Sequence, residues 1–472
     1  MEPEEFDLLV VGGGKAGKTL AMDRAKAGQH VAMIERAMIG GSCINVACIP
    51  TKAFVTSARV LAMVQRAGEY GITGVGDAVM DGALLHSHKD SVVAAMVASN
   101  HKQFIASGMD FILGEAQFVG PRTVHVLQHG GGARTLRGKE VVVDVGTEPL
   151  LPAIEGVTAD SVQTSDTMLM LEAIPPRFIV VGGGYVGVEY AAVLQAIGSQ
   201  VTLLDGGSQL LGREDPDVAD AVLSALTSLG VEVRLGVELS AVSRATGAAR
   251  APEPGRSTSP VTAQLSDGSQ LSADDLLMAV GRRPATAGLG LELAGVKMDA
   301  RGYIEVDDEL RTSAPHVWAA GDVAGTPQFT HASLDDYRVL KDNLAGAHRS
   351  TRDRVIPYVV FMTPELARVG LTEREAREAG HDVRIARMPA SVVPRNRTAG
   401  QLEGTWKAVV DRSSGLILGA ALLGSETSEV ITTVQLAMQA GLPHTALRDM
   451  IITHPTVTEG LNMLFSGEYL EE

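Results

Sequence analysis

Short apolar runs, glycine-rich turns and helical stretches follow one another in a fixed order near the start of the chain. Residues 6–11 form an apolar run of the kind that makes a buried parallel strand. A glycine-rich turn at 12–17, a helical stretch at 18–27 and a second strand at 30–34 come next. This order predicts a βαβ unit whose first turn binds a nucleotide.

The same order recurs in the middle of the chain. A strand at 178–181 leads into a glycine turn at 182–187, a helical stretch at 188–197 and a strand at 200–204. One such turn is weak evidence, because glycine-rich turns follow many strands. Two turns in the same strand–turn–helix context predict two nucleotide-binding units, and two ordinary glycine loops are the alternative.

The two turns also share their spacing. The glycines of the pattern are Gly12, Gly14 and Gly17 in the first copy and Gly182, Gly184 and Gly187 in the second. Such glycines allow a tight turn, close approach of a pyrophosphate and close packing of helix on strand. An acid follows at one distance in both copies, Glu35 (35 − 12 = 23) and Asp205 (205 − 182 = 23), where it would bind a ribose hydroxyl.

The second acid bears on the choice of nicotinamide. Residues 206–208 after Asp205 are Gly-Gly-Ser, without an arginine that could hold a 2′-phosphate. A carboxylate at this place repels a 2′-phosphate and accepts from a free ribose hydroxyl, which favours NADH. Arg213 lies eight residues further on and could fold back, so NADPH stays open.

Composition narrows the classes of function. At 472 residues the chain is expected to hold about three domains. A net charge of −16 and only 4% aromatic residues disfavour nucleic-acid binding. The acidic N-terminus does not resemble a secretory signal, and no run of about 18 apolar residues was found. We therefore expect a cytoplasmic protein that has no membrane partner and no membrane-spanning helix.

The chain has two cysteines, Cys43 and Cys48, five positions apart. In the cytosol such a close pair is more often catalytic or metal-binding than structural. The nearest histidines, His30 and His86, are not at ligand spacing, so no metal site is expected. Pro50 stands where a helix could begin, which places Cys48 near a helix N-terminus that favours the thiolate. Two incidental buried thiols are the alternative.

Several longer motifs then point to one family. Residues 40–52 read Gly-Gly-Ser-Cys-Ile-Asn-Val-Ala-Cys-Ile-Pro-Thr-Lys and resemble the redox-disulfide signature of the flavin-dependent pyridine-nucleotide disulfide oxidoreductases. Residues 312–322 resemble the second FAD motif of this family, 281–284 its return to the FAD domain, 361–373 the start of its dimerisation domain and 454–459 its acid–base segment. The resemblance covers nearly the whole chain and includes glutathione reductase, dihydrolipoamide dehydrogenase and mercuric reductase.

The resemblance implies an α/β fold with two Rossmann-like nucleotide-binding domains and a C-terminal α+β dimerisation domain. The expected boundaries are 1–147 with 280–345 for the FAD-binding domain, 148–279 for the NAD(P)H-binding domain and 346–472 for the dimerisation domain. It also implies a homodimer whose active site is shared between subunits. Residues 248–260 are expected to be an exposed turn that lengthens a hairpin.

Residue roles follow from the same resemblance. Cys48 would lie against the flavin while Cys43 attacks the substrate. Asp322 would bind the ribityl chain of FAD. His454 and Glu459 would be the acid–base pair, contributed by the partner subunit.

Three further residues would act beside the flavin. Lys52 and Glu189 would meet near its N5 atom, where a positive charge stabilises reduced flavin. Tyr185, inside the second glycine turn, would cover the flavin until nicotinamide displaces it, and a packing tyrosine is the alternative.

The leading functional hypothesis is reduction of a low-molecular-weight disulfide by NAD(P)H through FAD and a Cys43–Cys48 disulfide. Met22 replaces the arginine by which glutathione reductases hold their substrate, and no cysteine follows Cys48 as in mercuric reductases. Residues 14–21 look closest to the reactive-chlorine-resistance reductases. Dihydrolipoamide dehydrogenase, a metal-ion or oxidant-defence reductase and a non-catalytic redox sensor are the alternatives.

Overall fold

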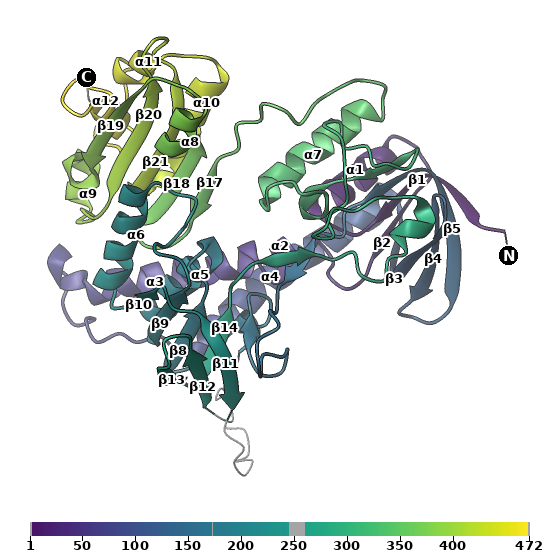
Figure 1. The fold of residues 1–472 in the computed structure, drawn as a ribbon, viewed down its shortest axis with the longest axis horizontal. Helices are drawn as coiled ribbons and strands as arrows, with labels where there is room; N and C mark the ends of the chain where they lie inside the picture. Colours follow the sequence, from purple (N-terminus) through teal and green to yellow (C-terminus); the bar gives the residue numbers. More distant parts are fainter. Residues whose placement is uncertain (1, 172, 245–259, 471–472) are drawn as a thin grey trace. The chain divides into compact units, whose positions relative to one another are not determined.

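The computed structural model describes residues 2–171, 173–244 and 260–470 (Figure 1). The chain divides into two compact units. The first unit comprises Met1–Ala53, Ser87–Leu150 and Arg282–Arg354, and the second comprises Phe54–His86, Leu151–Gly281 and Val355–Glu472. The expected hairpin extension at 248–260 lies outside the described residues, apart from Pro260.

A six-stranded sheet forms the centre of the first unit. Its strands are β1 (Glu4–Val11), β2 (Val31–Glu35), β3 (Asp110–Gly120), β4 (Thr123–Gln128), β5 (Ala133–Val143) and β16 (Val317–Ala319). Strand β1 runs parallel to both β2 and β5, and β4 joins β3 and β5 in antiparallel pairing. Residues 8–11 of β1 are at most 2% exposed, which explains why this strand reads as a continuous apolar run.

The first unit also contains helical segments. They are α1 (Lys15–Lys26), α2 (Ser42–Asn45), the start of α3 (Cys48–Gln65), most of α4 (Gly82–Ser107) and α7 (Thr330–Asn343). Helices α1 and α7 lie side by side (Figure 1). The short strands β6 (Thr147–Pro149) and β15 (Arg282–Pro284) pair where the chain leaves and re-enters the unit.

The second unit contains a five-stranded parallel sheet in the order β10-β9-β8-β14-β7. Its strands are β7 (Gln163–Thr164), β8 (Arg177–Val181), β9 (Gln200–Asp205), β10 (Glu232–Leu235) and β14 (Asp275–Met278). Helix α5 (Tyr185–Ala196) links β8 to β9, and α6 (Pro216–Ser228) links β9 to β10. An antiparallel sheet of β11 (Leu239–Arg244), β12 (Val261–Leu265) and β13 (Gln270–Ala273) adjoins them.

The C-terminal part of this unit is an antiparallel sheet in the order β17-β18-β21-β20-β19, with α10 (Thr427–Gln439) against β18 and β21 (Figure 1). Its strands are β17 (Tyr358–Val360), β18 (Glu365–Gly370), β19 (Val383–Pro389), β20 (Thr405–Asp411) and β21 (Ile417–Gly424). Its other helices include α8 (Glu373–Glu378), α9 (Pro394–Thr398), α11 (His444–Arg448) and α12 (Gly460–Leu464). The predicted α/β fold class, with two Rossmann-like nucleotide-binding domains and a C-terminal α+β domain, is confirmed.

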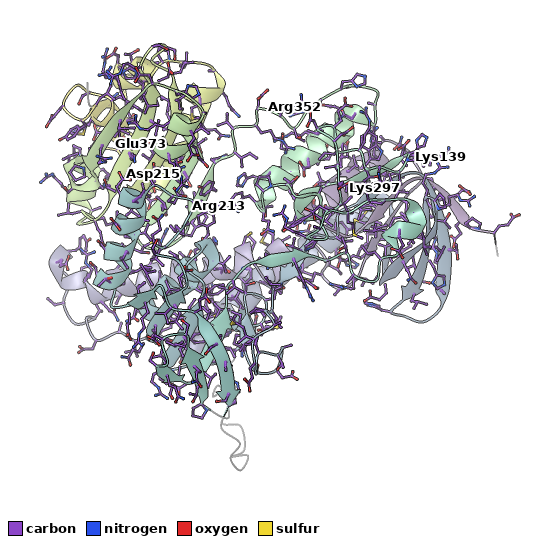
Figure 2. The ribbon with its side chains drawn as sticks, in the orientation of Figure 1. Lys139, Arg213, Asp215, Lys297, Arg352 and Glu373 are labelled. Atoms are coloured by element: carbon purple, nitrogen blue, oxygen red, sulfur yellow. The ribbon has the colours of Figure 1, made fainter. Side chains whose placement is uncertain are left out.

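A buried ion cluster joins helix α6 to the C-terminal sheet. Lys407 is 3% exposed, and its Nζ lies 3.0 Å from carboxylate oxygens of Asp215 and Asp217 and 2.9 Å from Glu373. Asp215 also accepts from the backbone N–H of Glu373 at 2.9 Å, and the two residues are close together in Figure 2. A buried lysine is tolerated when carboxylates surround it, as here.

Within the described residues, one helical segment meets the criteria for a membrane span by length and composition. It is Ser42–Gln65, with 24 residues and a mean hydropathy of 1.3. That the chain has no membrane-spanning helix stays a prediction. Core helices pass the same test, and 44% of the apolar window of this segment is buried inside the protein.

Candidate active site

Both cysteines lie at helix starts in the first unit. Cys43 is in α2, and Cys48 is the first residue of α3, which confirms the helix start expected near Pro50. The two residues are half-buried thiols. A hydrogen bond between the two sulfurs, together with burial, raises the pKa of the Cys43 thiol. The two sulfurs are therefore direct neighbours.

A threonine from a distant segment adjoins the pair. Thr330, the first residue of α7, has its Oγ1 3.6 Å from the Sγ of Cys48. Its hydroxyl also bonds Cys43 and lowers the pKa of that thiol. Thr330 was not predicted from the sequence, since nothing in its spacing links it to the cysteines.

The first glycine turn and its acid are held by backbone bonds. The N–H of Gly13 donates to Oε2 of Glu35 at 2.8 Å, while Oε1 of Glu35 accepts from Ala37 at 2.8 Å and Met38 at 2.9 Å. Gly12 has φ +98°, and a Cβ there would lie 2.4 Å from the carbonyl oxygen of Asp144. This turn therefore has no room for a side chain, as a cradle for a dinucleotide requires.

A chain of hydrogen bonds between side chains ends on Asp322 in the first unit. The hydroxyl of Thr147 donates to Oδ2 of Asp322 at 2.8 Å, and Nε of Arg282 donates to the same hydroxyl at 2.9 Å. Burial raises the pKa of Asp322, and the Thr147 hydrogen bond lowers it. Thr147 was not predicted as a site residue, because Asp322 lies 175 positions away in the sequence.

The second glycine turn repeats the geometry of the first. The N–H of Gly183 donates to Oδ2 of Asp205 at 2.5 Å, and the N–H of Gly207 donates to Oδ1 at 2.7 Å. Gly187 packs so closely that a Cβ would lie 1.8 Å from the carbonyl oxygen of Gly182. Arg213, labelled in Figure 2, has an exposed side chain.

Tyr185 belongs to a buried polar cluster in the second unit. Its hydroxyl donates to the hydroxyl of Tyr358 at 3.1 Å, and that hydroxyl donates to Oε1 of Glu214 at 2.7 Å. Glu214 is fully buried, with its Oε2 2.7 Å from Nε of Arg368. Of this cluster only Tyr185 was predicted from the sequence, because its partners are far away in the chain.

The two charges expected beside the flavin lie in different units. Lys52 is half-buried on α3 in the first unit. Glu189 is buried on α5 in the second unit, where its Oε1 accepts from the N–H of Phe361 at 2.7 Å. Their pairing stays a prediction.

His454 and Glu459 contact each other in the second unit. Nδ1 of His454 lies 2.8 Å from Oε2 of Glu459. The histidine side chain is 69% exposed, whereas that of the glutamate is 13% exposed. The contact orients the imidazole and leaves Nε2 as the nitrogen that would exchange a proton.

Sequence and structure comparisons relate the chain to known proteins. The family model described as pyridine nucleotide-disulphide oxidoreductase matches residues 6–336, and the model of its dimerisation domain matches residues 356–464. The probable pyridine nucleotide-disulfide oxidoreductase RclA of Escherichia coli is 39% identical over 98% of this chain and 99% of its own length. The dihydrolipoyl dehydrogenase of Thermus scotoductus is 35% identical over 97% of this chain and 96% of its own.

A solved structure agrees with these matches. The Cu(II) complex of the HOCl-induced flavoprotein disulfide reductase RclA from Escherichia coli superposes with a TM-score of 0.88. It is 38% identical to this chain, and the match covers 98% of this chain and 99% of that protein. The likeness therefore extends over both units.

Proposed function

Because the chain belongs to the pyridine nucleotide-disulphide oxidoreductase family, we propose that it reduces a low-molecular-weight disulfide through a Cys43–Cys48 redox pair. Members of this family use FAD and take electrons from NAD(P)H, and this chain is an oxidoreductase of that kind. One observation carries the proposal. Cys43 lies against Cys48, and Cys48 is the first residue of α3, where the helix N-terminus favours its thiolate.

The first unit is suited to hold FAD. The glycine turn with Gly12, Gly14 and Gly17 has no space for side chains, which is what close approach of a pyrophosphate requires. Glu35 would take the ribose, and Asp322, held by Thr147, would take the ribityl chain. When bound, FAD accepts hydride from nicotinamide and passes two electrons to a disulfide.

The second glycine turn would hold the nicotinamide nucleotide, through Gly182, Gly184 and Gly187. We propose NADH as the preferred donor. Both oxygens of Asp205 accept backbone N–H groups, which fixes a carboxylate where a 2′-phosphate would otherwise lie. Arg213, eight residues further on, is exposed, and NADPH would be the donor if this side chain turned back to the site.

The cysteines would act in sequence on the substrate. The Cys43 thiolate attacks one substrate sulfur, so that a mixed disulfide forms and the other substrate sulfur leaves as a thiolate. The Cys48 thiolate then attacks Sγ of Cys43, which restores the Cys43–Cys48 disulfide and releases the second thiolate. His454 of the partner subunit, oriented by Glu459, would protonate the leaving thiolates. The catalytic unit is then a homodimer. We place it in the cytoplasm, where cellular reductants keep thiols reduced and a close cysteine pair is typically catalytic.

An acceptor panel tests the proposal. Purified holoenzyme is assayed for NADH and NADPH oxidation with lipoamide, glutathione disulfide, mycothiol-type and ergothioneine-type disulfides, Cu(II) and Hg(II). The matched control is Cys43→Ser. The proposal expects one disulfide to give turnover well above the others, and Cys43→Ser to abolish it. Turnover that survives in Cys43→Ser would overturn it.

The similarity to RclA supports a second candidate, reduction of Cu(II) or defence against oxidants. That relative is described as HOCl-induced and has been solved as a Cu(II) complex. Among the residues that the structure describes, no group of three or more His, Cys, Asp or Glu is arranged to hold a metal ion. Cu(II) would then be a substrate at the cysteine pair, and the same panel decides between the two.

A further inference from the structure

Lys18 is a buried lysine in the middle of the first nucleotide-binding unit. It stands on α1, one residue after the last glycine of the first turn, and is 5% exposed. Lysine is almost never fully buried unless its ammonium has partners, because removing the charge from water is costly. Nothing in the binding of a dinucleotide by the glycine turn requires a lysine at this place.

The ammonium of Lys18 is directed to the segment that carries Cys43. Its Nζ donates to the carbonyl oxygen of Gly40 at 2.6 Å and to Oδ1 of Asn100 on α4 at 3.1 Å. Gly40 has φ +93°, and a Cβ there would lie 2.9 Å from Cδ1 of Ile44. Lys18 therefore fixes a constrained turn just before the helix of Cys43.

Charges from four elements act on this ammonium. Burial, and the neighbouring charge of Lys15 on α1, lower the pKa of Lys18 to about 8. Cys43 on α2, Asp144 after β5 and Glu35 at the end of β2 act in the opposite direction. The interaction is mutual, since Lys18 lowers the pKa of the Cys43 thiol.

We propose that Lys18 is a positioning residue for Cys43, which holds the turn at Gly40 and stabilises the Cys43 thiolate by its positive charge. The inference rests on the proposed function, in which Cys43 attacks the substrate. NAD(P)H supplies two electrons and one proton, so breaking the Sγ–Sγ bond leaves one sulfur as a thiol and the other as a thiolate, and Lys18 favours the thiolate on Cys43. The lysine itself transfers no proton and does not touch the substrate.

The effect of Lys18 on the Cys43 thiolate depends on pH. Lys18 is charged below about pH 8 and neutral above it, so its effect on Cys43 is present at neutral pH and fades at alkaline pH. The other groups that face Cys43 are the thiol of Cys48 and the hydroxyl of Thr330, and neither is a cation. Of the three groups that act on Cys43, Lys18 is therefore the one that carries a positive charge.

Alkylation of Cys43 in the NADH-reduced holoenzyme tests this. The rate with iodoacetamide is followed by peptide mass spectrometry from about pH 6 to about pH 9, because the thiolate is the reactive form. Lys18→Met removes charge and hydrogen bonds, Lys18→Gln keeps a donor without charge, and Lys18→Arg keeps the charge. Lys26→Met, at the exposed end of the same helix, is the matched control.

We expect Lys18→Met and Lys18→Gln to slow alkylation of Cys43 about tenfold at neutral pH, and to move its midpoint to higher pH. Lys18→Arg should recover most of the rate, and Lys26→Met should match the wild type. Unchanged rates in Lys18→Gln would overturn the proposal, as would Lys18→Arg being as slow as Lys18→Gln. Because labelling reads Cys43 directly, these outcomes are independent of which acceptor the enzyme uses and of the Cys43→Ser turnover test.

Discussion

The hydroxyl of Tyr358 holds Tyr185 in place, and its removal should change how the nicotinamide nucleotide binds. Tyr358 donates to Oε1 of Glu214 at 2.7 Å and accepts from the hydroxyl of Tyr185 at 3.1 Å. Tyr185 is expected to move aside for nicotinamide, and we propose that the position in which it bonds Tyr358 is the closed position that nicotinamide displaces. Tyr358→Phe keeps the ring and deletes both bonds, while Tyr185 keeps its own bond of 3.3 Å to Oε1 of Glu214.

The magnitude can be worked from the two bonds. A hydrogen bond to a charged group contributes about 1.5–3 kcal/mol, and one between neutral groups about 0.5–1.5 kcal/mol. Loss of the bond to buried Glu214 should lower the free energy of unfolding by about 2 kcal/mol. Loss of the bond to Tyr185 should weaken its closed position by about 1 kcal/mol, which is roughly a fivefold shift towards the open position.

Two measurements follow. Thermal unfolding of the holoenzyme reports stability, and anaerobic stopped-flow reduction of the flavin as a function of NADH concentration gives the apparent Kd of NADH. The apparent Kd should fall by up to about fivefold, because a larger fraction of the enzyme is competent to bind. Tyr190→Phe is the matched control. Tyr190 lies on α5 with Tyr185, and its hydroxyl donates to the carbonyl oxygen of Ser165 at 3.0 Å instead. An apparent Kd in Tyr358→Phe that is unchanged, or that moves equally in Tyr190→Phe, would refute the reasoning.

Three other changes have defined outcomes. Thr147→Val removes the hydroxyl between Arg282 and Asp322 and should weaken FAD retention about tenfold, measured by flavin fluorescence after dilution, whereas Thr147→Ser should restore it. His454→Ala should lower disulfide turnover by about 10²–10⁴, with flavin reduction by NADH unchanged in stopped flow, and equal losses in both steps would contradict its role. Because the pKa of Lys18 falls from 10.5 to about 8 on folding, the unfolded chain binds more protons between these values. The stability of the wild type relative to Lys18→Met should therefore rise with pH, by up to about 3 kcal/mol, and equal melting-temperature differences at about pH 7 and about pH 10 would contradict this.

The parts of the fold that depend on local pattern could be predicted from the sequence. Buried strands before glycine turns, and acids at equal spacing, placed both nucleotide-binding units. The helix after each turn begins at Lys15 and at Tyr185, three residues before the predicted starts at 18 and 188. The reason is that the last residues of each glycine turn already form the first helical turn, which periodicity of apolar positions does not reveal.

The parts that depend on distant contacts could not be predicted. Tyr358 and Glu214 meet Tyr185 across long stretches of chain, and no spacing rule joins them. Lys18 contributed to the sequence prediction only as part of the segment 14–21 that resembles a family branch. Its burial could not be predicted, because most lysines on helices are exposed. Thr330 reaches Cys48 from the other end of the first unit's sequence.

The central claim is that Cys43 and Cys48 form a redox pair in electronic contact with FAD. Anaerobic titration of the holoenzyme with dithionite, followed by flavin absorbance, tests it most directly. Since FAD and a disulfide are each two-electron couples, the wild type should take up four electrons per FAD and Cys43→Ser only two. A wild type that is fully reduced by two electrons, or a Cys43→Ser variant that still takes up four, would contradict the account.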